Sequence, residues 1–570
     1  MSNPSRSVAA NYLQALLDRG IDYVFANAGT DTAPIIEALV AAKNAGIKTP
    51  EFLTIPHENV AISMAHGYFL ATGKPAAVMV HVTVGTANAL CGLMNAARDQ
   101  APILLTAGRT PSTETGHIGS RNASIHWGQD SFDQGGSVRE WVKWDYELRP
   151  GQAPEEIVGR ALDIAMSEPK GPVYLCMPRE VLGDLTDKQA PKPRARELGS
   201  LPATPSAAGI RQAAQWLSEA KFPLIITSSS GRDAANVARL SRIAATYGIG
   251  VAMPGEPGAR ELNIPTNHPM FLGIHPADAI AQADAVLALD CEVPWWPSKV
   301  SPQAHAKLIH IAPDPMFARY PVRGFQMDLA IAGSSSQALE MLEQALQLVC
   351  AANPAAVAAR QSQFTAISAE RNRKQQALVQ AMQDRRPLHP AWIAHCLNQV
   401  INEDTIIVNE MGVPMEFLEL QTPRSYLSSS LAGGLGFGLG AAVGAKLGAP
   451  HKQVILIVGD GSYMFGCPTA AHHAARMHGL PTTTLVMNNA RWNAVHRSTL
   501  GMYPDGVASK EAMMPLVSLG DSPAYDGIMQ ACGGYGEKVD DPGQLTAALK
   551  RCLAANARGQ SALLNLLTGD

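Results

Sequence analysis

The sequence predicts an α/β protein with three doubly wound parallel-sheet domains. Short aliphatic runs such as Ala76–Val80, Ala285–Leu289 and Val454–Val458 recur along the chain, and they have the length and composition of buried strands. Segments with helical periodicity separate them, and this alternation is typical of parallel sheets covered by helices. The chain has 570 residues, too many for one hydrophobic core, since a domain holds roughly 100–200 residues.

We expect the three domains at residues 1–187, 206–350 and 388–570. Residues 188–205 are rich in Pro, Lys and Arg and lack an apolar period, which predicts a linker. Residues 351–387 are polar with helical character, which predicts a second connector. The three domains share an architecture but no repeated sequence.

The individual elements follow from the apolar runs and their flanking residues. A helix is expected over residues 7–19, because its periodicity ends at Gly20. Further helices are expected from Glu58 to Tyr68, Gly85 to Ala97 and Ala470 to His478. In the first domain, strands are expected at Tyr23–Phe25, Leu53–Ile55, Ala76–Val80, Pro102–Thr106 and Val173–Cys176. In the later domains they are expected at Leu224–Ile226, Gly250–Ala252, Ala285–Leu289, Leu308–Ile311, Thr405–Val408, Val454–Val458 and Thr483–Met487.

Composition and charge exclude several classes of protein. With 46% hydrophobic and 16% charged residues, the chain is typical of a globular protein with a large interior. The formal net charge of −4 and the lack of long basic runs argue against a nucleic-acid partner. The eight scattered cysteines have neither zinc nor C-x-x-C spacing, which is typical of a reducing compartment. Neither a signal peptide nor a membrane-spanning stretch is predicted, so we expect a cytoplasmic enzyme without a membrane partner.

A polar motif follows two apolar strands of the third domain. Gly459-Asp460-Gly461-Ser462 comes directly after Val454–Val458, in a turn that we expect only glycines to permit. Asn488 and Asn489 end the next strand. Because parallel strands end at the same edge of a sheet, Asp460 and Asn489 should meet there. Carboxylate and amide oxygens are hard ligands, which suit a Mg²⁺ ion that also binds phosphate oxygens.

This pattern resembles the thiamin-diphosphate motif of enzymes that decarboxylate or ligate 2-oxo acids. The resemblance implies that Asp460, Asn489 and the backbone carbonyl of Arg491 bind Mg²⁺, and that the metal holds the diphosphate of the cofactor. It also assigns the rest of the motif, Gly459, Gly461 and Ser462, to cofactor binding.

From Gly20 to Tyr146 the chain is similar to benzoylformate decarboxylase and its relatives. The residues that carry this similarity are Gly20–Phe25, Glu58, Gly67–Tyr68, Gly73–Pro75, His81, Gly85–Ala89, Thr106–Gly108 and Val142–Tyr146. Val408–Glu410 and Ala432–Gly438 add to it in the third domain. The similarity implies a pyrimidine-binding first domain, a central domain and a diphosphate-binding third domain.

The same similarity assigns roles to three residues of the first domain. Glu58 would be the carboxylate that hydrogen-bonds the pyrimidine ring of the cofactor, His81 an acid–base group, and Thr30 the residue that orients the substrate carboxylate. Each residue also has an ordinary structural interpretation. Glu58 would suit the first turn of any helix, His81 a strand end, and Thr30 a turn.

In the third domain, the Gly433 carbonyl aligns with the acceptor for the pyrimidine amine. Leu435 aligns with the bulky residue that holds the cofactor in a bent shape. Elsewhere the chain departs from benzoylformate decarboxylase, because the region of its second catalytic histidine contains Trp295 and Trp296 instead. The segment with His496 and Arg497 is more like acetolactate-synthase-like proteins. The roles of these four residues stay open.

The sequence thus predicts a lyase that depends on thiamin diphosphate and Mg²⁺, decarboxylates a 2-oxo acid and has carboligase side activity. The first alternative is an acetolactate-synthase-like carboligase that joins an activated aldehyde to an acceptor. A remote alternative is an NAD-dependent dehydrogenase, since Gly436-x-Gly438-x-x-Ala441 mimics a dinucleotide fingerprint. The family resemblance also implies a homodimer or homotetramer with active sites shared between chains, acting on a small 2-oxo acid or aldehyde.

Overall fold

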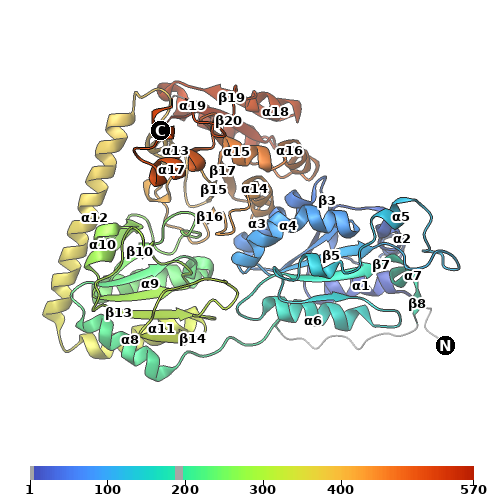
Figure 1. Cartoon of the computed structure of the whole chain (residues 1–570), viewed down its shortest axis with the longest axis horizontal. Coiled ribbons are helices and arrows are strands. Elements are labelled where there is room, and N and C mark those ends of the chain that lie inside the picture. The colour runs from blue at the N-terminus through green and yellow to red at the C-terminus, as the bar shows by residue number, and fades with distance from the viewer. Residues whose placement is uncertain (1–5, 187–196, 512, 570) are drawn as a thin grey trace. The chain divides into compact units, whose positions relative to one another are not determined.

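The computed structural model describes residues 6–186, 197–511 and 513–569 (Figure 1). Residues 1–5, 187, 512 and 570 of the predicted domains, and 188–196 of the predicted linker, lie outside the described residues. Three six-stranded sheets, each parallel throughout, account for most strands, which confirms the predicted α/β class. The domain boundaries stay a prediction.

The first sheet has the strand order β3-β2-β4-β5-β7-β6. Its strands are β2 (Tyr23–Ala26), β3 (Glu51–Thr54), β4 (Ala76–Val80), β5 (Ile103–Arg109), β6 (Asp145–Glu147) and β7 (Val173–Pro178). The helices of this part are α1 (Val8–Asp18), η1 (Thr30–Thr32), α2 (Ala33–Asn44), α3 (Glu58–Thr72), α4 (Val82–Arg98), α5 (Ile125–Gly128), η2 (Gly135–Ser137), α6 (Pro154–Met166) and α7 (Arg179–Gly183). A two-stranded antiparallel sheet pairs β1 (Arg6–Ser7) with β8 (Leu185–Thr186).

The central sheet has the order β11-β10-β9-β12-β13-β14. Its strands are β9 (Pro223–Thr227), β10 (Gly250–Met253), β11 (Phe271–Ile274), β12 (Ala285–Leu289), β13 (Lys307–Ala312) and β14 (Leu329–Ala332). The helices here are α8 (Ala207–Glu219), η3 (Ser230–Arg232), α9 (Ala234–Tyr247), α10 (Ala277–Gln282) and α11 (Ser335–Cys350). The predicted second connector is one long helix, α12 (Pro354–Met382), which is drawn in yellow in Figure 1.

The third sheet has the order β16-β15-β17-β18-β20-β19. Its strands are β15 (Thr405–Glu410), β16 (Tyr426–Ser428), β17 (Gln453–Gly459), β18 (Thr483–Asn488), β19 (Tyr535–Val539) and β20 (Ala562–Leu567). The helices of this stretch are α13 (Pro390–Asn398), η4 (Met415–Phe417), α14 (Phe437–Gly448), α15 (Asp460–Phe465), α16 (Pro468–Met477), α17 (Asn493–Met502), η5 (Ala508–Lys510), α18 (Tyr525–Ala531), η6 (Pro542–Gln544) and α19 (Leu545–Ala557).

The first and third sheets have the same topology. In each sheet, the strand that comes first in the sequence lies between the second and the third. Strand β2 pairs with β3 and β4, and β15 pairs with β16 and β17, so the winding direction reverses between β2 and β4 and between β15 and β17. Ligands of open parallel sheets bind beyond the carboxyl ends of the strands at such a reversal. Thr30 follows β2, His81 follows β4 and Asp460 follows β17, so all three lie at reversal points.

The chain divides into two compact units. The first contains residues 1–201, 430–450 and 466–480, and the second contains the remainder, with the central and third sheets. Within the first unit, α14 packs closely along α3. A side chain at Gly67 would overlap the backbone of Ala441, and one at Gly444 would overlap the backbone of Met64. Glycine at these positions therefore allows the two helix backbones to touch.

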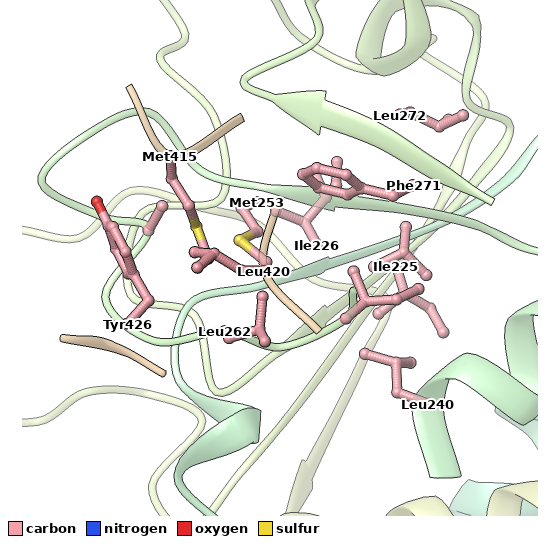
Figure 2. Close-up of a cluster of buried hydrophobic side chains, with 14 of the residues drawn as sticks. Ile225, Ile226, Leu240, Met253, Leu262, Phe271, Leu272, Met415, Leu420 and Tyr426 are labelled. Atoms are coloured by element: carbon pink, nitrogen blue, oxygen red, sulfur yellow. The ribbon is translucent and has the colours of Figure 1, made fainter. Parts of the chain in front are cut away.

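The second unit has a continuous hydrophobic core. Figure 2 shows Ile225 and Ile226 of β9 with Phe271 of β11, and Met415 and Tyr426 from the third domain in the same cluster. All of these side chains are buried. The central sheet and the third sheet therefore share one apolar core. In the described parts of the chain, no helix is long and apolar enough to span a membrane.

Candidate active site

In the second unit, Asp460 comes directly after the last residue of β17. It is the first residue of α15, and only 3% of its surface is exposed. Its Oδ1 accepts a hydrogen bond from the Gly461 amide and its Oδ2 one from the Ala490 amide, both at 2.8 Å. Burial raises the pKa of Asp460, and these backbone donors oppose the shift. A cation beside the carboxylate would offset the cost of burying its charge.

Asn489 follows β18, and the chain there folds back onto Asp460. Ala490, whose amide binds Asp460, has a positive φ of 53°. The Asn489 Oδ1 accepts a hydrogen bond from the Arg491 amide at 3.2 Å. The Asp460 carboxylate and the Asn489 amide oxygen thus follow neighbouring strands, and the Ala490 amide ties the chain after β18 to Asp460. This donor set fits Mg²⁺, which is bound by a few protein oxygens and completes its octahedron with water or phosphate.

The local structure of the Gly459–Ser462 motif differs from our expectation. We predicted a turn that only glycines permit, but β17 runs directly into α15, and neither Gly459 nor Gly461 has a positive φ. Glycine is needed at position 461 for another reason. A side chain there would overlap the Trp492 ring, which also lies edge-on to Phe465 with ring centroids 5.8 Å apart. Sequence reasoning missed this packing of Trp492.

In the first unit, Glu58 begins α3 directly after His57, the N-cap residue. Its Oε2 accepts a hydrogen bond from the Asn88 side chain of α4 at 2.9 Å. Gly85, one turn earlier on α4, leaves space beside the other carboxylate oxygen. The carboxylate is half-buried and held by a neutral donor. Asn88 belongs to the Gly85–Ala89 segment that carries the family similarity, but the sequence assigned it no role.

His81 caps the N-terminus of α4 after β4, and its side chain is 16% exposed. Its Nδ1 forms a short hydrogen bond with the carboxylate of Asp31, a residue that sequence reasoning also missed. This hydrogen bond raises the pKa of His81 while burial lowers it, and the charges of Asp31 and Glu58 raise it further. Thr30, next to Asp31, is exposed at the start of η1.

The loop before α14 carries Gly433 and Leu435 in the first unit. Gly433 is exposed with a φ of 67°, and Leu435 is half-buried. The buried side chain of Asn95 on α4 binds Gly434 between them through two hydrogen bonds. Its Nδ2 donates to the Gly434 carbonyl at 2.8 Å, and its Oδ1 accepts from the Gly434 amide at 3.1 Å. Asn95 therefore fixes the backbone that presents Gly433 and Leu435.

The four residues whose roles were left open have different surroundings. Trp295 is 5% exposed and packs edge-on against Phe325, so it is part of the central core. Trp296 is 42% exposed and stacks on the His275 ring at 4.3 Å. His496 and Arg497 lie on α17, which buries none of its side chains.

Comparison with known families identifies all three domains. The N-terminal TPP binding domain of thiamine pyrophosphate enzymes matches residues 6–136, their central domain matches 210–342, and their C-terminal TPP binding domain matches 411–566. The chain belongs to the thiamine pyrophosphate enzymes. Thiamine pyrophosphate is thiamin diphosphate, so the predicted family and cofactor class are confirmed for this enzyme.

Relatives of this thiamine pyrophosphate enzyme include decarboxylases and a synthase. The benzoylformate decarboxylase of Pseudomonas aeruginosa is 28% identical over 508 residues, 85% of this chain and 86% of that protein. The acetolactate synthase large subunit of Mycobacterium tuberculosis is 25% identical over 585 residues, 99% and 96% of the two chains. Among solved structures, the thiamine diphosphate-dependent 4-hydroxybenzoylformate decarboxylase of Rhodococcus jostii RHA1 superposes with a TM-score of 0.78 at 22% identity, over 99% of each chain.

Proposed function

We propose that this enzyme is a thiamin-diphosphate- and Mg²⁺-dependent lyase that decarboxylates a 2-oxo acid, with carboligase side activity. The observation that carries the proposal is the buried Asp460 carboxylate at the strand-order reversal of the third sheet, with the Asn489–Arg491 backbone folded onto it. A buried carboxylate at this edge is suited to a metal that binds a diphosphate.

In this proposal the second unit holds the charged end of the cofactor. Asp460, Asn489 and the Arg491 carbonyl would bind Mg²⁺, and the Gly459–Ser462 segment would face the diphosphate. The first unit would hold the rings, with the Gly433 carbonyl as acceptor for the amine and Leu435 as the apolar support. Asn95 would keep these two residues in place through its paired hydrogen bonds to Gly434.

When bound, thiamin diphosphate supplies a carbon nucleophile and takes up the electrons released as CO₂ leaves. Glu58 would share a proton with the pyrimidine ring, and Asn88 holds the carboxylate in one orientation. His81 would give or take a proton at the oxygen that derives from the substrate carbonyl. The hydrogen bond to Asp31 raises the pKa of His81, which favours the protonated ring that can act as an acid. Thr30, exposed at the start of η1, would bind the substrate carboxylate.

The second candidate is an acetolactate-synthase-like carboligase. The observation that favours it concerns residues 290–297. By the family resemblance, this segment corresponds to the region of benzoylformate decarboxylase that contains its second catalytic histidine. Here that region presents a buried Trp295 and a Trp296 stacked on His275, with no histidine of its own. One proton donor fewer would slow release of an aldehyde and leave more time for an acceptor to react.

A substrate panel separates the two candidates. We expect purified protein to release CO₂ from at least one aryl or alkyl 2-oxo acid in the presence of thiamin diphosphate and Mg²⁺. Aldehyde as the main product supports the decarboxylase, and a hydroxyketone formed at a comparable rate on addition of an acceptor aldehyde supports the carboligase. The absence of CO₂ release from every member of the panel would contradict both.

The metal site is tested by Asp460→Asn, which removes the charge and keeps the shape. We expect loss of turnover and of the thermal stabilisation that thiamin diphosphate with Mg²⁺ gives the wild type. Asp278→Asn, at an exposed position of α10, is the matched control and should behave as wild type. Normal Mg²⁺ dependence in Asp460→Asn would refute the proposed ligand set.

A further inference from the structure

Asp31 is a buried carboxylate to which the proposed function gives no task. It is the second residue of η1, directly after Thr30, and 4% of its surface is exposed. One carboxylate oxygen binds His81 Nδ1. The other lies against Gly108 at the end of β5, where any side chain would overlap the carboxylate. The Asp31 side chain thus fits a space between β4 and β5 that only glycine at position 108 leaves open.

The His81 ring is confined on a second side by Gly29. A side chain at Gly29 would overlap the ring at Nδ1 and Cγ, so the imidazole lies directly on the backbone of the loop after β2. An ionised carboxylate only accepts hydrogen bonds, so Nδ1 carries a proton in the bond to Asp31. Nε2 is then the nitrogen that is left to exchange protons, and its direction is set by Asp31 and Gly29 together.

We propose that Asp31 is a positioning residue that acts through His81, fixing its ring orientation and its tautomer so that Nε2 serves as the acid–base atom. This inference rests on the acid–base role proposed for His81. It gives the Asp31 carboxylate a role in the reaction that is exerted through the His81 ring. In the same arrangement, a protonated His81 is stabilised by the adjacent negative charge and its Nε2–H can act as an acid.

Two further titratable groups near His81 lie on α3 and α5. Glu58 at the start of α3 has a negative charge that also favours protonated His81. His126 on α5 has its pKa lowered by burial and by the positive charges of Arg179 and Arg121, which disfavours its charged form. The Gln129 side chain also hydrogen-bonds the ring but carries no charge. Asp31 is the charged partner that is hydrogen-bonded to the ring, so its replacement should change the pKa of His81 most.

The test is Asp31→Asn, which keeps the volume and removes the charge. An amide presents either an oxygen or an NH₂ group to Nδ1, so the tautomer is no longer fixed. We expect kcat to fall about 10- to 100-fold, by analogy with the loss of a partner that orients a metal-bound histidine. The pH midpoint of kcat that belongs to His81 should move to lower pH, and the Kd for thiamin diphosphate should stay unchanged.

A second readout does not depend on turnover. Diethyl pyrocarbonate modifies the neutral imidazole, so the rate of modification of His81 depends on the fraction of the ring that is neutral. This rate can be followed by mass spectrometry across pH. We expect its midpoint to shift to lower pH in Asp31→Asn. Asp184→Asn is the matched control, because Asp184 binds His117 Nε2 at 3.1 Å in the same unit but is 41% exposed and remote from His81 in the sequence. The control should leave the midpoint for His81 unchanged.

A double variant decides whether Asp31 acts through His81. If it does, Asp31→Asn should cause little further loss of kcat in a His81→Ala background. An equal loss in both backgrounds, or wild-type kcat and midpoints in Asp31→Asn alone, would overturn the inference. Normal turnover in His81→Ala would overturn both the inference and the proposed acid–base role of His81. The metal-site part of the proposed function is tested independently, by Asp460→Asn.

Discussion

Asp460 and His81 each come directly after a buried parallel strand, next to the point where the strand order of a sheet reverses. Their surroundings differ. Asp460 is held by two backbone amides, so its position depends mainly on the course of the chain. His81 is held by another side chain, Asp31, and by close contact with Gly29. The metal site therefore depends on backbone geometry, and the acid–base site on packing between loops.

Replacement of His81 tests the acid–base role directly. In His81→Ala we expect kcat to fall by roughly 10²–10⁴, the usual contribution of a placed acid–base group, with little change in the Kd for thiamin diphosphate. If His81 had only a structural role, its replacement would instead lower the thermal midpoint and leave turnover near normal in the folded fraction. Turnover within about threefold of wild type would contradict the catalytic role, and all three quantities should be measured on one preparation.

Asn95 provides a second prediction for a single side chain. Asn95→Ala removes both hydrogen bonds to Gly434, so the loop with Gly433 and Leu435 should become less ordered. With an expected cost of about 1–2 kcal/mol, the Kd for thiamin diphosphate should rise roughly 5- to 30-fold. Asn44→Ala, at the exposed end of α2, is the control. An unchanged Kd, measured by calorimetry, would show that the loop is held without Asn95.

At the level of secondary-structure elements, the proposed site depends on closely packed helices that carry its residues. Helix α3 carries Glu58, α4 carries Asn88 and Asn95, and α14 follows the loop with Leu435. The backbones of α3 and α14 touch through glycines, so these elements behave as one packed body. A change in helix spacing should therefore change the site.

The glycines of this helix pair are expected to be intolerant of side chains. Gly67→Ala should destabilise the protein by about 1–3 kcal/mol, because the new methyl group would overlap the Ala441 backbone. Gly501→Ala is the matched control on helix α17, where nothing lies within 4 Å of the new methyl group, and it should be neutral or slightly stabilising. Equal thermal midpoints for the two variants would contradict the close packing.

The buried His472 on α16 should make stability depend on pH. Burial lowers its pKa from an ordinary 6.5 to about 4, and 3% of its surface is exposed. Above pH 6.5 the residue is neutral in both states. As the pH falls from 6.5 to 4, the unfolded chain takes up a proton that the folded chain does not, so stability decreases by up to about 3 kcal/mol.

The measurement compares thermal midpoints of the wild type and His472→Gln across this pH range. The variant should lose less stability than the wild type on acidification, whatever its stability at pH 7. His473→Gln is the control, since the neighbouring His473 is exposed. A wild-type pH dependence in His472→Gln would show that the histidine is protonated in the folded state.

At the scale of the whole molecule, the residues proposed for one active site lie in two compact units. Thr30, Glu58, His81, Gly433 and Leu435 belong to the first unit, and Gly459–Ser462, Asn489 and Arg491 belong to the second. The proposed function needs both sets at one cofactor. By the family resemblance, we propose a homodimer or homotetramer in which one chain supplies Glu58 and another supplies Asp460.

Subunit complementation tests this shared site. Glu58→Gln and Asp460→Ala should each be inactive alone. After dissociation and reassociation of a mixture, part of the activity should return, because some mixed dimers contain one intact site. Each variant taken alone through the same cycle is the control. If mass spectrometry confirms exchange of subunits and activity stays absent, each active site is built from a single chain.

The sequence by itself determined the fold class and the positions of most strands. Ala76–Val80 and Ala285–Leu289 were predicted with the observed bounds, and the other expected strands differ by a few residues at most. Buried parallel strands are continuous apolar runs, so their signal is local and needs no partner. The positions of Glu58, His81 and Asp460 at strand ends follow from the same signal. The three parallel sheets confirmed the α/β architecture, and the comparison with known families confirmed the family and the cofactor class.

The tertiary structure alone decided which side chains support these residues. Asp31 lies 50 positions from His81, and Asn95 lies 339 positions from Gly434. Glycine is needed at position 461 because the Trp492 ring packs there, and not because of the turn that the sequence suggested. Each of these contacts depends on how loops cross at the edge of a sheet and on space that a glycine leaves elsewhere in the chain. Neither factor leaves a periodic pattern in the sequence, because pairing of distant side chains is set by packing in three dimensions and not by the local preference of either segment.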